Sequence, residues 1–386
     1  MTASFSFAPP RLPEGAEALR AEVRAFLGES RRTLGWEPNS NFMANFSAEF
    51  SRSLGARGLL GMTWPKAYGG RARSALERFV VTEELLAAGA PCAAHWIADR
   101  QSGPLLLRFG TEEQKRDILP RIARGECYFS IGMSEPDSGS DLASVRTRAT
   151  RTPNGWRIEG TKVWTSNAHL NHYAITLART GPAGQSRHEG LSQFLIDLKA
   201  DGVGIRPIVN MLGDHEFNEM VFDGVEIAED RLLGREGEGW KQVTSELAFE
   251  RSGPERYFST FHLLDAAITA LSGQVDATAK AQIGRLIAHF VSLRSLSLAV
   301  AGKLDAGENP GVAAALVKDL GNAFEREVIE VIRGLAPFVA SRPEPGGAED
   351  VSAALGRAVL QVPSYGLRGG TKEIMRSIIA RELGLR

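Results

Sequence analysis

The stretch Tyr173-Ala-Ile-Thr-Leu177 alternates large apolar residues with smaller ones. This period of two predicts a β-strand. Phe194-Leu-Ile-Asp-Leu198 and Met220-Val-Phe222 alternate in the same way, and clusters of Gly, Asn and Asp separate the three runs, as turns between strands require. The region from about Tyr128 to Leu233 is therefore predicted to be a β domain.

The region before this β domain, from about Glu17 to Arg124, is predicted to be mostly helical. Thr111 can cap a helix, and Gln114, three residues later, can reach back to it. Apolar residues follow at helical spacing, although Pro120 predicts a break or kink in that helix.

Helices are predicted again from about Gly237 to Arg386, with a loop at Pro343–Glu349, which is rich in Pro and Gly. The last helix, after Thr371, places four apolar residues on one face. These residues are Ile374, Met375, Ile378 and Ile379. The predicted domains are residues 1–127 (helical), 128–234 (β) and 235–386 (helical).

Composition excludes several classes of protein. The 386 residues carry a formal net charge of −1, which predicts no attraction to nucleic acid. Two cysteines, Cys92 and Cys127, are too few for a disulfide framework or a zinc ribbon, and no metal site is expected. Met1–Pro13 lacks the apolar run of a signal peptide, and no stretch reaches the roughly 18 apolar residues of a membrane span. The chain is expected to be soluble and cytoplasmic.

Two segments of the β region could contact a ligand. Ile131-Gly-Met-Ser-Glu-Pro-Asp-Ser-Gly-Ser-Asp141 combines small residues and hydroxyls, so its backbone could approach an anion, or it could be a simple Gly/Ser-rich turn. It matches neither a Walker loop nor the fingerprint GxGxxG. In Lys162-Val-Trp-Thr-Ser-Asn167, the Trp could stack on a planar ring or could be a half-buried strand residue.

Glu250 continues an apolar stripe on a predicted helix. The stripe is formed by Trp240, Val243 and Leu247. A carboxylate on an inward face is costly unless it is paired or protonated. Glu250 is therefore either a functional carboxylate or the partner of Arg251 or Arg256 at the rim of a helical bundle.

Arg368-Gly-Gly-Thr-Lys-Glu-Ile374 places two glycines and a capping threonine before the last helix. Glycines allow close approach of the backbone to a ligand at a helix N-terminus. The alternative is a simple helix cap.

Four segments, taken in their order and separations, resemble the acyl-CoA dehydrogenase family over nearly the whole chain. They are Gly58–Gly70, Gly103–Gln114, Met133–Asp141 and Gly370–Glu382. The resemblance implies a mainly α fold with a middle β-barrel: an N-terminal helical domain, the barrel and a C-terminal four-helix bundle. It also implies FAD at a dimer interface, usually in a homotetramer.

The resemblance implies positions for FAD residue by residue. Backbone around Ile131 to Met133 and the hydroxyl of Ser134 would meet the flavin ring, Trp164 would cover it, and Ser166 would bond near its N5. Ser140 would lie near the pyrophosphate and the acyl-CoA. The remaining expected FAD contacts are Lys280, Thr371 and Glu373.

The resemblance also implies a mechanism in which a base removes the α-proton of an acyl-CoA while hydride leaves the β-carbon for flavin N5. Many members carry the base directly before the C-terminal Gly-Thr, but here that position is Gly369. A minority, including isovaleryl-type enzymes, place the base where this chain has Glu250, followed by Arg251. The N–H of Gly369 would bond the thioester oxygen, and Gly370 would adjoin the substrate. The absence of a side chain at Gly369 suits a branched or bulky acyl group.

Two interface motifs of the family are weakened. Arg-x-x-Phe-Gly is replaced by Lys280-Ala-Gln-Ile-Gly284, and Gln-x-x-Gly-Gly by Glu330-Val-Ile-Arg-Gly334. This resembles bacterial enzymes built from two different subunits, including some that act on steroid side chains. Homo- and hetero-oligomers, dimers or tetramers, remain open. An electron-transferring flavoprotein is the expected electron acceptor. The alternatives are an acyl-CoA oxidase of the same fold and a non-catalytic partner subunit.

Overall fold

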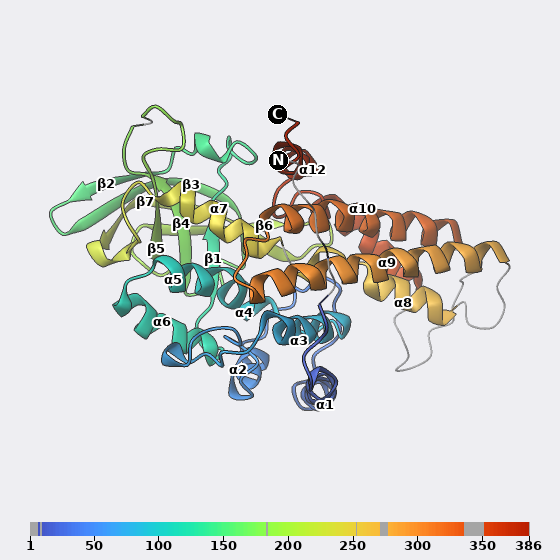
Figure 1. Ribbon diagram of the computed structural model, residues 1–386. Coiled ribbons are helices and arrows are strands. Elements are labelled where there is room, and N and C mark those ends of the chain that lie inside the picture. Colours follow the sequence, from blue (N-terminus) through green and yellow to red (C-terminus); the bar gives the residue numbers. More distant parts are fainter. Residues whose placement is uncertain are drawn as a thin grey trace. The chain divides into compact units, whose positions relative to one another are not determined.

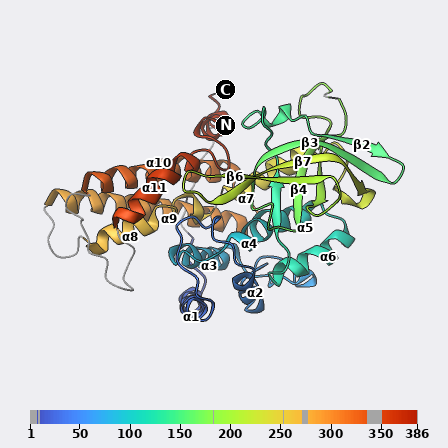
Figure 2. The same ribbon diagram turned by 180° about the vertical axis from the view of Figure 1, so that it is seen from behind.

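The computed structural model describes a chain of two compact units, shown in Figures 1 and 2. The described residues are 7, 10–182, 184–251, 253–270, 277–335 and 351–385, with only the backbone at 247–250. The helical unit comprises Met1–Asn41, Ala75–Ala90 and Arg251–Arg386, and the sheet unit comprises Phe42–Ser74 and Pro91–Glu250. The predicted loop Pro343–Glu349 lies outside the described residues.

One mixed sheet dominates the sheet unit. Its strands are β1 (Phe129–Gly132), β2 (Arg148–Thr152), β3 (Gly155–Ser166), β4 (Tyr173–Arg179), β5 (Leu191–Asp197), β6 (Val203–Val209), β7 (His215–Ala228) and β8 (Leu232–Leu233). They are ordered β6-β7-β3-β2-β4-β5-β8, and β1 pairs with β4 in parallel. The three alternating runs of the sequence are confirmed as parts of β4, β5 and β7.

The expected closed barrel is wrong, because the sheet is open. Among the described strands, the path begins at β6 and ends at β8, and no pairing joins these two ends. A barrel requires every strand to be hydrogen-bonded on both sides. Here β8 has only two residues, and β2 meets β4 at a single pair, Arg148 and Arg179.

Both faces of the central strands are buried, which the alternating pattern did not predict. Ile175 of β4 and Leu195 of β5 pack in a core with helical residues such as Leu106 and Ile122. Ala174 of β4 and Phe194 of β5 pack in a second core on the other face. Small residues on one face of β4 therefore do not mark a solvated face; they accommodate large side chains of neighbouring strands.

The helices of the sheet unit lie before, between and after its strands in the sequence. They are α2 (Ala48–Ala56), η1 (Lys66–Tyr68), α4 (Ala93–Ile97), η2 (Ala98–Ser102), α5 (Gly103–Phe109), α6 (Glu112–Ala123), η3 (Leu142–Ser144), η4 (Glu229–Arg231) and α7 (Gly239–Glu250). The reciprocal capping bonds between Thr111 and Gln114 are confirmed at the start of α6. The predicted break at Pro120 is absent, because α6 continues to Ala123 with Leu119 and Ile122 buried against the sheet.

The helical unit contains α1 (Ala16–Leu34), α3 (Ala75–Ala87), η5 (Pro254–Arg256), α8 (Phe261–Ala270), α9 (Ala277–Asp305), α10 (Gly311–Leu335), α11 (Val351–Tyr365) and α12 (Lys372–Glu382). Figures 1 and 2 show α9 and α10 side by side, with α11 next to α10. One buried carboxylate joins two N-terminal helices to α9: Glu83 of α3 accepts from Arg20 of α1 and from Arg294 of α9.

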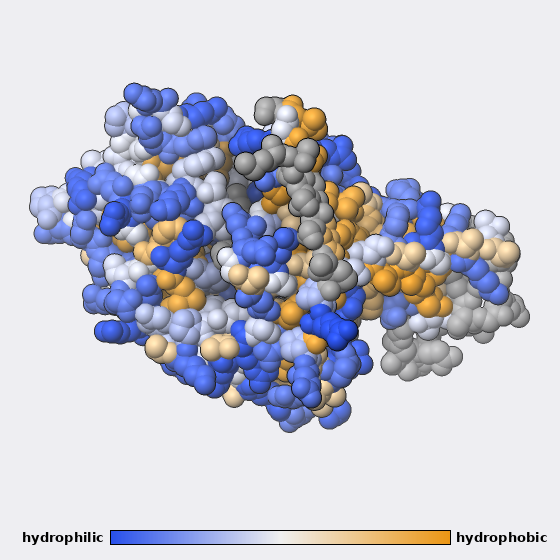
Figure 3. Space-filling view, viewed as in Figure 1, coloured by the Kyte–Doolittle hydropathy of each residue, from blue (hydrophilic) through white to orange (hydrophobic). Residues whose placement is uncertain are grey.

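Hydrophobic side chains remain exposed on α9 and α10, where Figure 3 shows an orange area. They include Ile287, Val291 and Leu320, which are 42%, 54% and 43% exposed. By length and composition, α9 is long and apolar enough to cross a membrane, whereas the sequence analysis expects no membrane span. The core helix of a soluble protein passes the same test.

Candidate active site

Strands β1 and β3 bring the two candidate ligand-binding segments of the sheet unit together. The Ser130 hydroxyl donates to the carbonyl oxygen of Ser166 at 2.9 Å. The Val163 N–H donates to the carbonyl oxygen of Ser134, also at 2.9 Å. The predicted flavin residues Ile131, Met133, Ser134, Trp164 and Ser166 therefore lie on adjacent segments, although Ser134 and Trp164 are 30 positions apart in the sequence.

Trp164 is held in an unusual conformation at the end of this strand pair. Its backbone φ is 61°, and that of Asn167 is 53°. A left-handed backbone is rare for a bulky residue and costs about 1–3 kcal/mol. The Trp164 side chain is nevertheless 60% exposed, beside the edge of the Phe217 ring at 6.0 Å. The strained backbone thus places the Trp164 indole on the surface of the sheet unit.

The hydroxyls of Ser134 and Ser166 are available beside this indole. Both residues are only partly buried, and neither hydroxyl makes a hydrogen bond within the described part of the chain. An exposed aromatic face with adjacent free hydroxyls matches a planar ring that carries polar edge atoms.

A buried ion pair between Lys162 and Glu135 holds the segment Ile131–Asp141 in place. The Lys162 ammonium is fully buried and donates to Glu135 Oε1 at 2.8 Å and to the Met133 carbonyl at 3.0 Å. Burial lowers the pKa of Lys162 to about 8, against the attraction of Glu135. Burial would raise the pKa of Glu135, but the charge and hydrogen bond of Lys162, together with hydrogen bonds from Thr147 and from the Arg146 N–H, bring it below its usual value.

Lys162 begins the candidate segment Lys162–Asn167, but the sequence alone predicts no role for it. Its position in β3 gave a usable signal, because a lysine within a strand that enters the core needs a carboxylate partner. Only the tertiary structure shows that this partner is Glu135, within the same segment that presents Ser134.

Ser140 lies in an exposed loop that follows this segment. The neighbouring Asp141 accepts hydrogen bonds from Ser144 and from Arg187, both at 2.5 Å. These bonds lower the pKa of Asp141, with Ser144 contributing most. Next to Arg187, the His188 ring stacks on Trp240 at 4.0 Å between centroids. Ser140 therefore sits beside a polar cluster on the outside of the sheet unit.

In the helical unit, two cations hold the Gly369–Gly370 turn. Arg251 Nε donates to the Gly369 carbonyl at 3.0 Å, and the buried Lys318 Nζ donates to the Gly370 carbonyl at 2.6 Å. Both glycines have left-handed backbones, with φ of 68° and 101°. Thr371 follows at the N-cap of α12, but its hydroxyl makes no capping bond, contrary to the expected cap.

Arg368, the residue before this turn, pairs with Glu325 in the core of the helical unit. Glu325 is fully buried, and burial raises its pKa despite its neighbour Arg368 at 3.3 Å. Glu325 Oε1 also accepts from the Ser259 N–H at 3.0 Å, whereas its Oε2 is a buried atom without a hydrogen bond in the described part of the chain. Sequence reasoning missed Lys318 and Glu325, because each stands alone on a helix with no motif around it.

The remaining predicted residues are Glu250, Lys280 and Glu373. Glu250 ends α7, but its side chain lies outside the described residues, so neither of its alternatives is tested. Lys280 is exposed on α9, and Glu373 is exposed in the first turn of α12. The pKa of Glu373 is lowered by its own backbone N–H and by Thr371.

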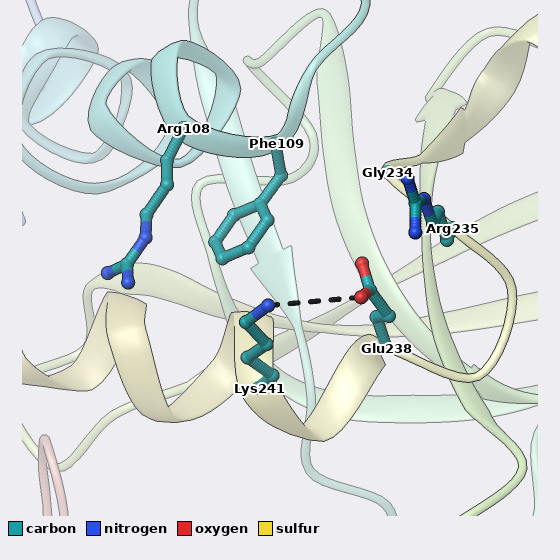
Figure 4. Close-up of a pocket in the computed structure, with 6 residues that line it drawn as sticks. All are labelled: Arg108, Phe109, Gly234, Arg235, Glu238 and Lys241. Atoms are coloured by element: carbon teal, nitrogen blue, oxygen red, sulfur yellow. Dashed lines mark ion pairs between the residues drawn. The ribbon is translucent and has the colours of Figure 1, made fainter.

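A separate cavity of about 440 Å³ lies in the sheet unit, where Figure 4 shows it between the ends of α5 and α7. It is lined by Arg108, Phe109, Gly234, Arg235, Glu238 and Lys241. Lys241 and Glu238 pair at 3.8 Å. None of the predicted site residues lines this cavity.

Comparison with known families gives two matches. Residues 13–126 match the acyl-CoA dehydrogenase N-terminal domain, and residues 130–225 match the acyl-CoA dehydrogenase middle domain. Acyl-CoA dehydrogenase FadE26 of Mycobacterium tuberculosis is 31% identical over 94% of this chain and 95% of its own length. Acyl-CoA dehydrogenase IpdE1 of the same organism is 39% identical, but that match spans 62% of this chain and 63% of the relative.

Two solved complexes are similar along almost the whole chain. The Tcur3481-Tcur3483 steroid ACAD is 29% identical with a TM-score of 0.83, covering 97% of this chain and 98% of the other. The ChsE4-ChsE5 complex from Mycobacterium tuberculosis is 29% identical with a TM-score of 0.79, covering 98% of this chain and 100% of the other.

Proposed function

Because the chain belongs to the acyl-CoA dehydrogenase family, we propose that it removes two hydrogens from the α- and β-carbons of a branched or steroid-derived acyl-CoA. Members of this family are FAD flavoproteins and oxidoreductases that act on CH–CH bonds. The observation that carries the proposal is the adjacency of the Ile131–Ser134 segment to the strained, exposed Trp164.

The residues of this segment fit FAD. Trp164 offers an exposed aromatic face, and the hydroxyls of Ser134 and Ser166 are available for polar atoms at the edge of the ring. The Lys162–Glu135 pair keeps the backbone around Met133 in place. When bound, FAD supplies the acceptor for the hydride that leaves the β-carbon.

The Gly369–Gly370 turn suits the thioester end of the substrate. A thioester α-proton becomes acidic enough for a base only when hydrogen bonds stabilise the developing negative charge on the carbonyl oxygen. We assign one such bond to the Gly369 N–H. Arg251 and Lys318 fix the turn by binding its two carbonyl oxygens, so the N–H direction is set before the substrate arrives.

Gly369 cannot act as a base, so the proposal assigns proton abstraction to Glu250 at the end of α7. The Glu250 carboxylate would take the α-proton while the N–H of Gly369 bonds the oxygen. Ser140, Thr371 and Glu373 are assigned to FAD or CoA contacts, and Lys280 to FAD, on the family resemblance alone.

Assembly with a homologous but different chain is part of the proposal. Two similar solved structures are complexes of two named chains, ChsE4-ChsE5 and Tcur3481-Tcur3483. The exposed Ile287, Val291 and Leu320 on α9 and α10 offer apolar area for such a contact. An electron-transferring flavoprotein is proposed as the acceptor.

The test is anaerobic bleaching of the flavin by a panel of acyl-CoAs, from short branched to steroid-derived, with the chain purified alone and with co-expressed homologous subunits. Glu250→Gln should retain FAD and lose bleaching. Glu238→Gln, which alters a half-buried carboxylate just before the same helix, should bleach as the wild type does. Normal bleaching by Glu250→Gln would remove Glu250 from the mechanism. A wild-type chain that binds FAD with no partner and bleaches with none of the panel would remove the proposed reaction.

A further inference from the structure

The segment Trp164–Asn167 at the end of β3, here called the Trp164 turn, has a strained backbone at both of its ends. Trp164 and Asn167 have left-handed backbones, and of the two residues between them, Thr165 has a fully buried side chain. The pairing of β3 with β7 is irregular here, because the register shifts between Lys162 and Thr165. Such a conformation persists only where surrounding groups fix it.

Asn218 of β7 is one group that fixes this turn. It is fully buried, and its Nδ2 donates to the Thr165 carbonyl at 3.0 Å. A carbonyl can only accept, so this bond settles which end of the amide is nitrogen. Asn218 Oδ1 then faces His215 Nε2 at 2.7 Å, and His215 must be the donor. The Asn218 amide therefore donates to the Thr165 carbonyl and accepts from His215.

His215 is fixed in turn by a second ring. It stacks on His169 with centroids 3.7 Å apart and planes 12° from parallel. His169 belongs to the segment that follows Asn167, and the Asn167 N–H donates to the Glu216 carbonyl beside His215 at 2.8 Å. The turn and the start of β7 therefore hold each other at three points: a stacked ring pair, a backbone bond and the buried amide.

We propose that Asn218, oriented by His215, is a positioning residue that holds the Trp164 indole in the orientation in which it covers the flavin. This inference rests on the proposed function, because it assigns Trp164 to the flavin. Asn218 touches neither reacting atom; it acts through the Thr165 carbonyl, one peptide bond from Trp164. A turn held only for stability would have no reason to present a large apolar ring to the outside.

The test measures FAD affinity and flavin fluorescence of the protein purified with whatever subunit it needs to hold FAD. Asn218→Leu keeps the side-chain volume and removes both hydrogen bonds, so FAD should bind about tenfold more weakly and its fluorescence should be less quenched. His215→Phe, which keeps a ring but loses the donor, should act in the same direction. His215→Gln restores an N–H donor and should recover most of the affinity.

Trp164 itself provides the discriminating control. Trp164→Ala should weaken FAD binding, and adding Asn218→Leu to it should weaken binding little further, because both changes remove the same contact. Asn210→Leu, which removes bonds to the Leu212 and Asp214 N–H groups in the turn between β6 and β7, should lower stability without changing FAD affinity.

The outcomes distinguish a failure of the positioning role from a failure of the proposed function. If the wild type binds FAD and Asn218→Leu binds it equally well, the positioning role is wrong and the proposed function stands. If the effects of Trp164→Ala and Asn218→Leu simply add, Asn218 does not act through the indole. If the wild type binds no FAD under any assembly, the proposed function fails and the positioning role fails with it.

Discussion

Replacing Lys162 by Met should destabilise the sheet unit by about 3 kcal/mol at pH 7. The variant keeps the aliphatic stem but leaves Glu135 without its buried cation. Removing one partner of a buried ion pair usually costs about 3–5 kcal/mol. The lower end applies here, because Glu135 keeps two backbone donors, the N–H groups of Arg146 at 2.6 Å and Thr147 at 2.8 Å.

The assay is urea unfolding at pH 7 of the wild type, Lys162→Met and the double variant Lys162→Met/Glu135→Gln. The double variant should recover part of the loss, because no uncompensated charge remains. Lys241→Met is the matched control, since it loses a 3.8 Å pair in which the Lys241 side chain is 63% exposed, and it should cost less than about 0.5 kcal/mol. A loss below about 1 kcal/mol in Lys162→Met, or a double variant no more stable than the single one, would refute the reasoning.

The same variant has a pH dependence of known sign. The pKa of Lys162 is about 8 in the folded chain, below its ordinary 10.5. The unfolded chain therefore binds more protons between pH 8 and pH 10.5, and this group makes the folded state more stable as pH rises through that window, by at most about 3 kcal/mol. Lys162→Met lacks this gain, so its deficit relative to the wild type should widen between pH 8 and pH 10.

Two substitutions test other parts of the fold. Gly370→Ala should lower stability by about 1–3 kcal/mol and slow turnover, because φ is 101° and a Cβ would lie 2.9 Å from Met375 Cε; thermal unfolding that matches the wild type would contradict this. Thr111→Ala should cost about 1 kcal/mol in urea unfolding, because it removes the capping bond to the Gln114 N–H at 3.2 Å. A neutral Thr111→Ala would show that tertiary contacts alone hold the start of α6.

The sequence predicted local structure well where one residue pattern decides it. The alternating runs became β4, β5 and β7, and the Thr111–Gln114 pair became a reciprocal cap, because both depend on neighbours a few residues away. The break predicted at Pro120 is absent, since packing of Leu119 and Ile122 against the sheet outweighs one lost backbone bond. Whether the sheet closes depends on pairings between distant strands, so the expected barrel could not be checked from the sequence.

The candidate site divides in the same way. The sequence by itself determined the family and the lack of a side chain at Gly369, and it predicted the flavin segments at Ile131–Ser134 and Trp164–Ser166, because these are matters of residue identity and spacing. Only the tertiary structure decided what holds those segments: Lys162 on Glu135, Asn218 on Thr165, and Lys318 on Gly370. Each of these bonds joins residues 27 to 53 positions apart, and burial gives the bond its strength. No local pattern in the chain records such a pairing, because the low-polarity surroundings that make it necessary exist only after folding.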